Sequence, residues 1–233
     1  YLNAGFKYCL FQRGPETVDG EGNYVINVKN SSGIITQSLF ILDSHSYSKG
    51  FFRDYDNLHQ NQVDWYASEV NRLTEINKSH GATDVIKSLM FFHIPLVEYK
   101  TAYDEYKNNG YKDTDNVRYI YGIAGEPDEL ICCGVNQDNM FEKMLELKST
   151  QGVFVGHDHL NNFSLEYNGG SGDYYIRLTY GLSIDYLAYF GIAKKTAQRG
   201  GTIITVRPDS SFDCYGVRML DKHEIHEVGD FEK

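Results

Sequence analysis

Short apolar runs and helical patterns alternate along the first part of the chain. Residues 23–30 (NYVINVKN) and 38–43 (SLFILD) are β-branched or apolar runs bounded by Gly, Asn and Ser, which predicts two strands. The SSG at 31–33 predicts a hairpin between them. From residue 57 to residue 77, apolar positions recur at helical spacing after an Asp-Asn start signal, so we expect an amphipathic helix there.

More strongly apolar strands follow in the middle of the chain. Residues 86–94 (IKSLMFFHI), stopped by Pro95, and residues 152–156 (GVFVG) predict two buried strands. Residues 139–149 (NMFEKMLELKS) carry apolar positions at helical spacing and predict a helix between them. Continuously apolar strands joined by a helix are typical of a sheet that is covered on both faces. The pattern therefore predicts an α/β fold.

In the last third of the chain, the strand-like runs are shorter and more often interrupted by turn residues. Four short strand-like runs split by Gly, Asn, Asp and Pro predict an antiparallel segment: FSLEYNG (163–169), DYYIRLTYG (173–181), GTIITVRPD (201–209) and CYGVRML (214–220). Residues 104–116 are polar and rich in Gly and Asn, and we expect them to form a solvated surface excursion. No repeat or low-complexity linker divides the chain, so residues 1–233 are interpreted as belonging to a single domain.

Composition narrows the class of function. An apolar fraction of 41% in 233 residues is sufficient for a sizeable core. The 22 Lys and Arg residues against 32 Asp and Glu residues give a net charge of −10, without the basic excess that non-specific nucleic-acid binding requires. No apolar run reaches the roughly 18 residues that span a membrane, so no membrane segment is predicted, while cytoplasmic and secreted locations both stay open. The adjacent Cys132 and Cys133 are expected to pack as free thiols.

Histidines follow two of the predicted buried strands. VFVGHDHLNNF (153–163) presents His157 and His159 directly after a strand, and side chains at i and i+2 of an extended segment point to the same side. In FFHIP (91–95), His93 lies at a strand end, where α/β sheets collect their ligands. Imidazole binds zinc, iron and manganese, so these histidines predict a metal site. The alternatives are polar loop residues for the pair and a satisfied core residue for His93.

Five stretches carry a resemblance to a known family. They are GPETVDGEGNYVINV (14–28), LFILDS (39–44), QNQVDWY (60–66), FFHIPLVEY (91–99) and VFVGHDHLNNF (153–163). In this order they resemble the calcineurin-like metallophosphoesterase superfamily, in the branch of Dcr2-type phosphatases and short purple-acid-phosphatase-like proteins. The resemblance extends over about residues 8 to 206. It implies a four-layer α/β/β/α sandwich with two divalent or trivalent metal ions (iron, manganese or zinc) at the strand ends.

The resemblance also implies roles for individual residues. The family builds its site from D-x-H, G-D-x-x-D (or -Y), G-N-H-D/E, a single histidine and G-H-x-H. His93 matches the single histidine and His157 the first of the final pair, and both would ligate one metal. His159 would ligate the other metal. Two metals with a bridging hydroxide would hydrolyse a phosphomonoester by in-line attack. Asp158 and Asn161 flank the ligands and are candidates for orienting them through hydrogen bonds, or are plain turn residues.

Two motifs of the family are absent from the sequence. The G-D dipeptides at 172–173 and 229–230 lack the following acid, and no G-N-H occurs. The chain therefore resembles the C-terminal portion of a phosphoesterase domain, incomplete at its N-terminal side, with the catalytic residues expected upstream of Tyr1. We expect the chain alone not to be a competent phosphatase, and to need its N-terminal portion or a partner chain.

Two other functions stay open. The L-D-S stretch followed by Q-x-x-W also resembles the cyclic-nucleotide phosphodiesterase branch, in which the substrate would be a phosphodiester. The second alternative is a non-catalytic binding or structural protein that keeps the fold.

Other histidines carry weaker signals. In ILDSHSYSKG (41–50), Asp43 and His45 have the spacing of a metal-binding D-x-H, but their position matches the later L-D-S stretch of the family. Asp43 is therefore predicted to brace the turn, and His45 is predicted not to ligate metal. The remaining histidines are predicted to be solvated: His59, His80, His223 and His226.

Overall fold

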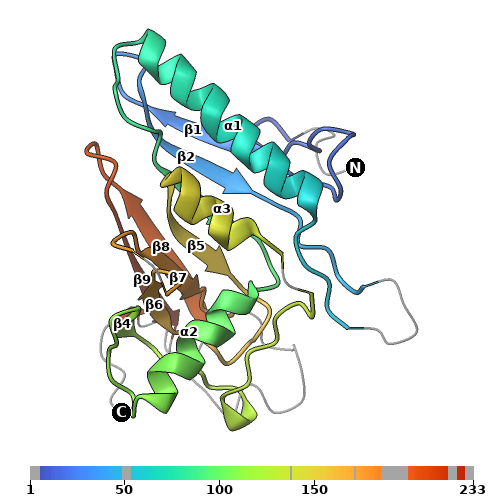
Figure 1. Cartoon of the computed structure of the whole chain (residues 1–233), viewed down its shortest axis with the longest axis vertical. Helices are drawn as coiled ribbons and strands as arrows, with labels where there is room; N and C mark the ends of the chain where they lie inside the picture. The colour runs from blue at the N-terminus through green and yellow to red at the C-terminus, as the bar shows by residue number, and fades with distance from the viewer. Residues whose placement is uncertain are drawn as a thin grey trace.

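The computed structural model describes residues 6–48, 54–136, 138–170, 172–184, 199–219 and 225–228 of the chain. The elements, in chain order, are β1 (Tyr24–Lys29), β2 (Ile35–Ile41), α1 (Gln60–Ser79), β3 (Ser88–Phe91), α2 (Val97–Asn108), β4 (Val117–Tyr121), the 3-10 helix η1 (Pro127–Glu129), α3 (Met140–Leu147), β5 (Thr150–Val155), β6 (Ser164–Tyr167), β7 (Ile176–Tyr180), β8 (Gly200–Val206), β9 (Phe212–Met219) and β10 (Ile225–Val228). Within these ranges, one seven-stranded sheet has the order β1-β2-β3-β5-β7-β6-β4, and a three-stranded sheet has the order β10-β9-β8 (Figure 1).

The predicted hairpin and the predicted α/β core are both confirmed. Strands β1 and β2 pair antiparallel, and β2, β3, β5 and β7 pair in parallel with their neighbours. The expected antiparallel pairing of the last third holds for β6 with β7 and for β8 with β9. Strand β7, however, also pairs in parallel with β5, so it belongs to the core of the large sheet.

Alternating side chains bury both faces of the central strands. Phe40, Met90 and Val153 are fully buried in the core that contains the helix residues Tyr66 and Tyr99. Their neighbours along the strands point the other way: Leu89 and Phe154 form a second apolar cluster with Cys214, Ile204 and Phe212 of the small sheet. Figure 1 shows the three α-helices on one side of the large sheet. The result is a helix, sheet and sheet stack, in agreement with the predicted sandwich.

The expectation of a solvated excursion at 104–116 is wrong for its first residues. Residues 104–108 form the last turn of α2, and Tyr106 in that turn is 3% exposed. Its ring stacks on Tyr119 of β4 with centroids 4.5 Å apart. The buried face of α2 consists of three tyrosines, one alanine and Glu98, and this is why the apolar pattern does not reveal the helix.

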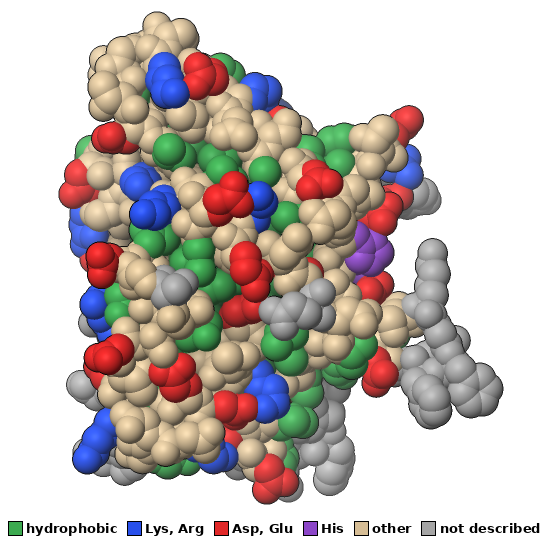
Figure 2. Space-filling model, viewed as in Figure 1, with side chains coloured by type: hydrophobic (Ala, Val, Ile, Leu, Met, Phe, Trp, Pro, Cys, Tyr) green, Lys and Arg blue, Asp and Glu red, His purple; other side chains and the backbone are tan. Residues whose placement is uncertain are grey.

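Charged side chains of both signs cover the outer face of the helices. Figure 2 shows Lys and Arg side chains interspersed with Asp and Glu across this face. Mixed charges of this kind fit the acidic composition and do not form the basic stripe of a nucleic-acid-binding surface on the face shown. In the described ranges, no helix combines the length and the apolarity needed to cross a membrane.

A half-buried carboxyl just before α3 makes stability depend on pH. Asp138 accepts the N–H of Met140 at 3.0 Å, and burial raises the pKa of this carboxyl from 3.8 to about 6. Since the folded state holds the proton more tightly, Asp138 costs stability as pH rises from about 4 to 6. Asp138→Asn keeps an acceptor for Met140 and removes this cost. We expect the variant to match the wild type at about pH 4 and to exceed its free energy of unfolding by roughly 2 kcal/mol at pH 7, in urea titrations. A difference that does not change with pH would contradict the assignment.

Candidate metal centre

The sheet topology brings the predicted ligands His93 and His157 together. Strands β3 and β5 are parallel neighbours, so their carboxyl ends meet at one edge of the sheet. The pairing continues past the strand ends, where the N–H of Gly156 donates to the carbonyl of His93 at 3.1 Å. In the structure, Nε2 of His93 lies 3.4 Å from Nδ1 of His157.

The third predicted ligand, His159, is close enough to act electrostatically on both rings of this pair but makes a contact of its own. Its Nδ1 is 3.4 Å from Oγ of Ser183, which follows β7 at the same sheet edge. Among the described residues, these three histidines do not form a group whose ligand atoms all lie within 4.8 Å of one another. The site is thus a close pair, His93 and His157, with a single imidazole beside it.

The environment favours neutral imidazoles. Burial lowers the pKa of His93, and the neighbouring His159 lowers it further. Burial also lowers the pKa of His157 and outweighs the opposing effect of Asp158. A neutral imidazole has the free lone pair that a metal ion requires, so both side chains are held in their ligating form.

The backbone at His157 adopts a rare conformation. Its φ is +75°, and the N–H of Asp158 donates to the carbonyl of Gly156 at 2.9 Å across it. This hydrogen bond from i+2 to i closes a γ-turn whose central residue has positive φ, the strained form of that turn. Histidine tolerates this region better than most residues. The turn aims the His157 ring at His93, and strain of this kind is typical of functional sites.

Asp158 and Asn161 brace the loop that carries these ligands. The Asp158 carboxylate is 6% exposed and accepts hydrogen bonds from the hydroxyl of Tyr180 at 2.6 Å and the N–H of Cys132 at 3.0 Å. Asn161 donates to the same carboxylate at 3.2 Å and to the carbonyl of Leu130 at 3.0 Å. These contacts connect the loop after β5 (residues 156–162), here called the histidine loop, to the segment that follows η1. Asp158 and Asn161 therefore hold the loop in place without contacting the histidine rings through these hydrogen bonds.

Cys132 and Cys133 are free, half-buried thiols, as expected. Burial raises the pKa of Cys132 to about 12, and the nearby Asp158 adds to this effect. Without a bound metal the thiol therefore stays protonated at neutral pH and is a poor nucleophile.

Ser44 of the L-D-S stretch positions His93. Its side chain is 2% exposed, and its Oγ accepts the N–H of His93 at 3.2 Å and the N–H of Ile94 at 2.9 Å. Strand β2 lies beside β3, so the residues after β2 are the natural place for such a brace. Sequence reasoning missed this residue, although the L-D-S stretch pointed to the turn that contains it.

Replacing Ser44 by alanine is expected to weaken the site and the fold together. Two buried amides lose their acceptor, which costs about 1–3 kcal/mol of unfolding free energy. Because His93 loses its support, we expect zinc affinity at the His93 pair to fall on the order of 10–100-fold. Urea unfolding and zinc titration measure the two effects. The exposed Ser46→Ala is the matched control; equal effects of the two substitutions would contradict the role of Ser44.

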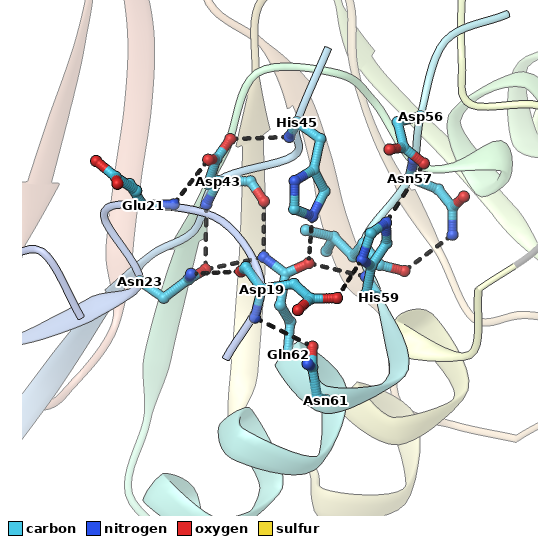
Figure 3. Close-up of polar contacts among 11 residues, drawn as sticks. Asp19, Glu21, Asn23, Asp43, His45, Asp56, Asn57, His59, Asn61 and Gln62 are labelled. Carbon is cyan, nitrogen blue, oxygen red and sulfur yellow. Dashed lines mark hydrogen bonds and ion pairs between the residues drawn. The ribbon is translucent and has the colours of Figure 1, made fainter. Parts of the chain in front are cut away.

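A network of hydrogen bonds connects three of the five stretches that carry the family resemblance (Figure 3). Asp43 accepts the N–H of His45 at 2.8 Å and the N–H of Glu21 at 2.9 Å, which confirms that it braces its turn. The Nε2 of Gln62, in α1, donates to Oδ1 of Asn23 at 2.9 Å and to the carbonyl of Asp43 at 2.7 Å. The G-N-Y, L-D-S and Q-x-x-W stretches therefore share one structural role.

The surroundings of His59 differ from the prediction of a solvated residue, whereas His80 is exposed as predicted. The His59 ring stacks on His45 with centroids 4.1 Å apart, and its Nδ1 lies 2.7 Å from Oδ2 of Asp19. Burial acts to lower the pKa of His59, but hydrogen bonds to Asp19 and Asp56 raise it overall. The described residues contain one group whose ligand atoms all lie within 4.8 Å of one another, and it is His45, Asp56 and His59. His223 and the side chain of His226 lie outside the described residues.

The fold is an α/β sheet with histidines at neighbouring strand ends, and comparison with known proteins confirms the resemblance to the calcineurin-like metallophosphoesterase branch. The chain is 29% identical over 161 residues to "Probable inactive purple acid phosphatase 14" of Arabidopsis thaliana, covering 65% of the chain and 36% of that protein. It is 28% identical over 180 residues to "Probable inactive purple acid phosphatase 29" of the same plant, covering 74% of the chain and 41% of that protein.

A yeast protein extends this similarity. The chain is 28% identical over 166 residues to "Phosphatase DCR2" of Saccharomyces cerevisiae, covering 68% of the chain and 26% of that protein. The matched region thus spans between 26% and 41% of the length of these three relatives. No family model matches the chain, and no solved structure matches it.

Proposed function

We propose that this chain forms part of a dinuclear metal-dependent phosphoesterase that hydrolyses phosphomonoesters, with His93, His157 and His159 as its metal ligands. The observation that carries the proposal is the pairing of His93 with His157 at one sheet edge, while the ring of His159 makes a separate contact with Ser183. This division agrees with the ligand sets that the family resemblance implies. The similarity to a protein named as a phosphatase supports the reaction class.

The donor chemistry of the pair fits a metal ion. Zinc–nitrogen bonds of about 2.0–2.1 Å at the tetrahedral angle place two ligand nitrogens roughly 3.3 Å apart. The 3.4 Å between Nε2 of His93 and Nδ1 of His157 is close to that separation. Iron and manganese also accept imidazole, so the donors are compatible with each of the three metals.

Three imidazoles carry no negative charge and cannot by themselves balance two metal ions. We therefore propose that carboxylate ligands come from the N-terminal portion of the protein or from a partner chain. The greater length of the matched relatives is consistent with this division.

The residues of this chain hold and orient the site. Bound metal ions would supply Lewis-acid stabilisation of the phosphoryl oxygens. Ser44 fixes the backbone of His93, and the γ-turn aims His157. The ring of Tyr55 lies across His157 with centroids 4.2 Å apart and an interplanar angle of 89°, which limits the rotation of the imidazole and covers one side of it.

A second candidate is a metal-binding protein that keeps the fold without catalysis. Two relatives are named as inactive, which favours this alternative at the level of the family branch. It shares the histidine site and differs only in turnover.

Hydrolysis assays separate these possibilities. We expect the chain of 233 residues to bind metal through His93 and His157 but to give little hydrolysis of p-nitrophenyl phosphate with iron, manganese or zinc. A longer form that includes preceding residues should hydrolyse this monoester in preference to bis(p-nitrophenyl) phosphate. Robust turnover by the chain alone would overturn the proposed division of ligands, and preference for the diester would overturn the monoester class. Metal binding without turnover in the longer form would establish the non-catalytic alternative.

A further inference from the structure

A second cluster of metal-ligating side chains lies beside the turn that follows β2. It contains His45, Asp56 and His59, with Asp19 contacting His59 from the loop before β1 (Figure 3). Asp56 and His59 are three residues apart before and at the start of α1, whereas His45 and Asp19 reach them from two other segments through the fold. The cluster is not needed by the proposed phosphoesterase site.

The two ring nitrogens of His59 face two different carboxylates. Its Nδ1 lies 2.7 Å from the Asp19 carboxylate, and its Nε2 lies 3.4 Å from Oδ1 of Asp56. A neutral imidazole has only one N–H, so it can donate to only one of these acceptors. If the proton lies toward the nearer Asp19, the lone pair on Nε2 faces the Asp56 carboxylate, and a cation between the two would bind to both. A carboxylate behind one ring nitrogen, with the other nitrogen free, is the usual surrounding of a metal-binding histidine.

The distances suit zinc. Bonds of about 2.0–2.2 Å at a tetrahedral angle place two ligand atoms roughly 3.3 Å apart. The 3.4 Å between His59 and Asp56 already has this value, and a ligand atom of His45 lies within 4.8 Å of both. The side chains of His59 and Asp56 are 36% and 16% exposed, so the cluster is open to an entering ion yet partly desolvated.

His45 can turn toward a metal without leaving a buried group unpaired. Its Nε2 lies 3.0 Å from Oε1 of Gln62, in a stack with the His59 ring. Gln62 keeps its other partners if His45 leaves, since its Oε1 also accepts the N–H of His59 at 2.8 Å and its amide nitrogen donates to Asn23 and Asp43. The backbone of His45, at φ +62°, stays fixed by the Asp43 carboxylate, so a side-chain rotation is sufficient.

We propose that His45, Asp56 and His59, with Asp19 hydrogen-bonded behind His59, bind a divalent transition metal of the zinc type at a site separate from His93, His157 and His159. Two imidazoles and a carboxylate are a common protein ligand set for zinc that leaves a fourth position for water. The two carboxylates balance the charge of the ion. The prediction that His45 does not ligate metal concerned the family's dinuclear centre, and the proposed site is a different one.

Zinc chloride and a competing chromophoric chelator test the proposal at neutral pH. The experiment uses a background in which the other site is silenced by His93→Ala, His157→Asn and His159→Ala. We expect this background to retain about one zinc per chain. Asp56→Asn, which has the same shape, should weaken that binding by more than about 100-fold, and Asp19→Asn on the order of 10–100-fold.

A control substitution and NMR of the histidine ring nitrogens test whether zinc binds at this cluster. The exposed His80→Ala is the matched control and should leave zinc affinity unchanged. Ring nitrogen resonances of His45 and His59 should shift on zinc addition in the background variant. No zinc binding in that background, or binding that Asp56→Asn leaves unchanged, would overturn the site. Rings that respond to pH but not to zinc would identify an imidazolium between two carboxylates instead, and would also overturn it. Neither outcome affects the His93 site, which is tested separately.

Discussion

Replacing His157 with asparagine is expected to lower the affinity of the His93 pair for zinc by more than about 100-fold, because loss of a residue that merely orients a ligand already costs 10–100-fold. The substitution removes one of two nitrogens that lie 3.4 Å apart and leaves His93 as a single imidazole. Asparagine suits the test better than alanine, since it tolerates the φ of +75° at this position. The γ-turn at residue 157 should therefore persist in the variant.

Zinc titration with a competing chelator measures this loss, in a background with Asp56→Asn so that the second cluster does not contribute. His80→Asn is the matched control, because this histidine is exposed and lies at the far end of α1. A zinc affinity in His157→Asn equal to that of the background would refute the pairing of His93 with His157.

Phe163→Ala is expected to cost about 3–5 kcal/mol of unfolding free energy, the usual range for a fully buried aromatic residue. Phe163 directly follows the histidine loop and is 0% exposed. Its ring contacts Tyr103 with centroids 4.8 Å apart, Tyr180 at 5.0 Å and Tyr99 at 6.3 Å. Removing the ring opens a cavity at the centre of this aromatic cluster, and the tyrosines can fill it only in part.

Urea unfolding measures the change as a lower midpoint with little change in slope. Ile123→Ala is the control, since this residue of the same region is 37% exposed and should cost about 0.5 kcal/mol or less. A similar midpoint shift for both substitutions would contradict the central role of Phe163. Because Tyr180 also donates to Asp158, loosening of this cluster should also loosen the histidine loop.

The parts of the fold that could be predicted are those whose burial shows in the local pattern. Strands β2, β3 and β5 each carry an apolar run at the carboxyl end because both of their faces are covered there, and the sequence predicts each of them. Helix α2 buries tyrosines, whose polar tips and charged neighbours conceal the helical period. Strand β4 was missed for a related reason, since its side chains alternate between partial burial and exposure at a sheet edge.

Some features of the candidate site could likewise be predicted from the sequence, and others could not. The placement of His93 and His157 at one edge follows from their positions after two apolar strands, so the sequence could predict it. The support by Ser44 and the contact of Asp19 with His59 depend on tertiary placement, since Asp19 and His59 are 40 residues apart in the chain. Asp19 lies in a loop without periodicity, so no local signal connects it with the start of α1.

The assembly of this sheet edge has a consequence for folding kinetics. The His93 and His157 rings meet although they are 64 positions apart in the sequence, and Ser44 contacts His93 from 49 positions away. Contacts of such separation require closure of long loops, which is slow compared with formation of the helices. Metal-binding capacity at His93 and His157 should therefore emerge only in the last phase of refolding. The rate of zinc binding after dilution from denaturant would then report the rate at which β3 pairs with β5. The circular dichroism of the helices would report only the earlier steps.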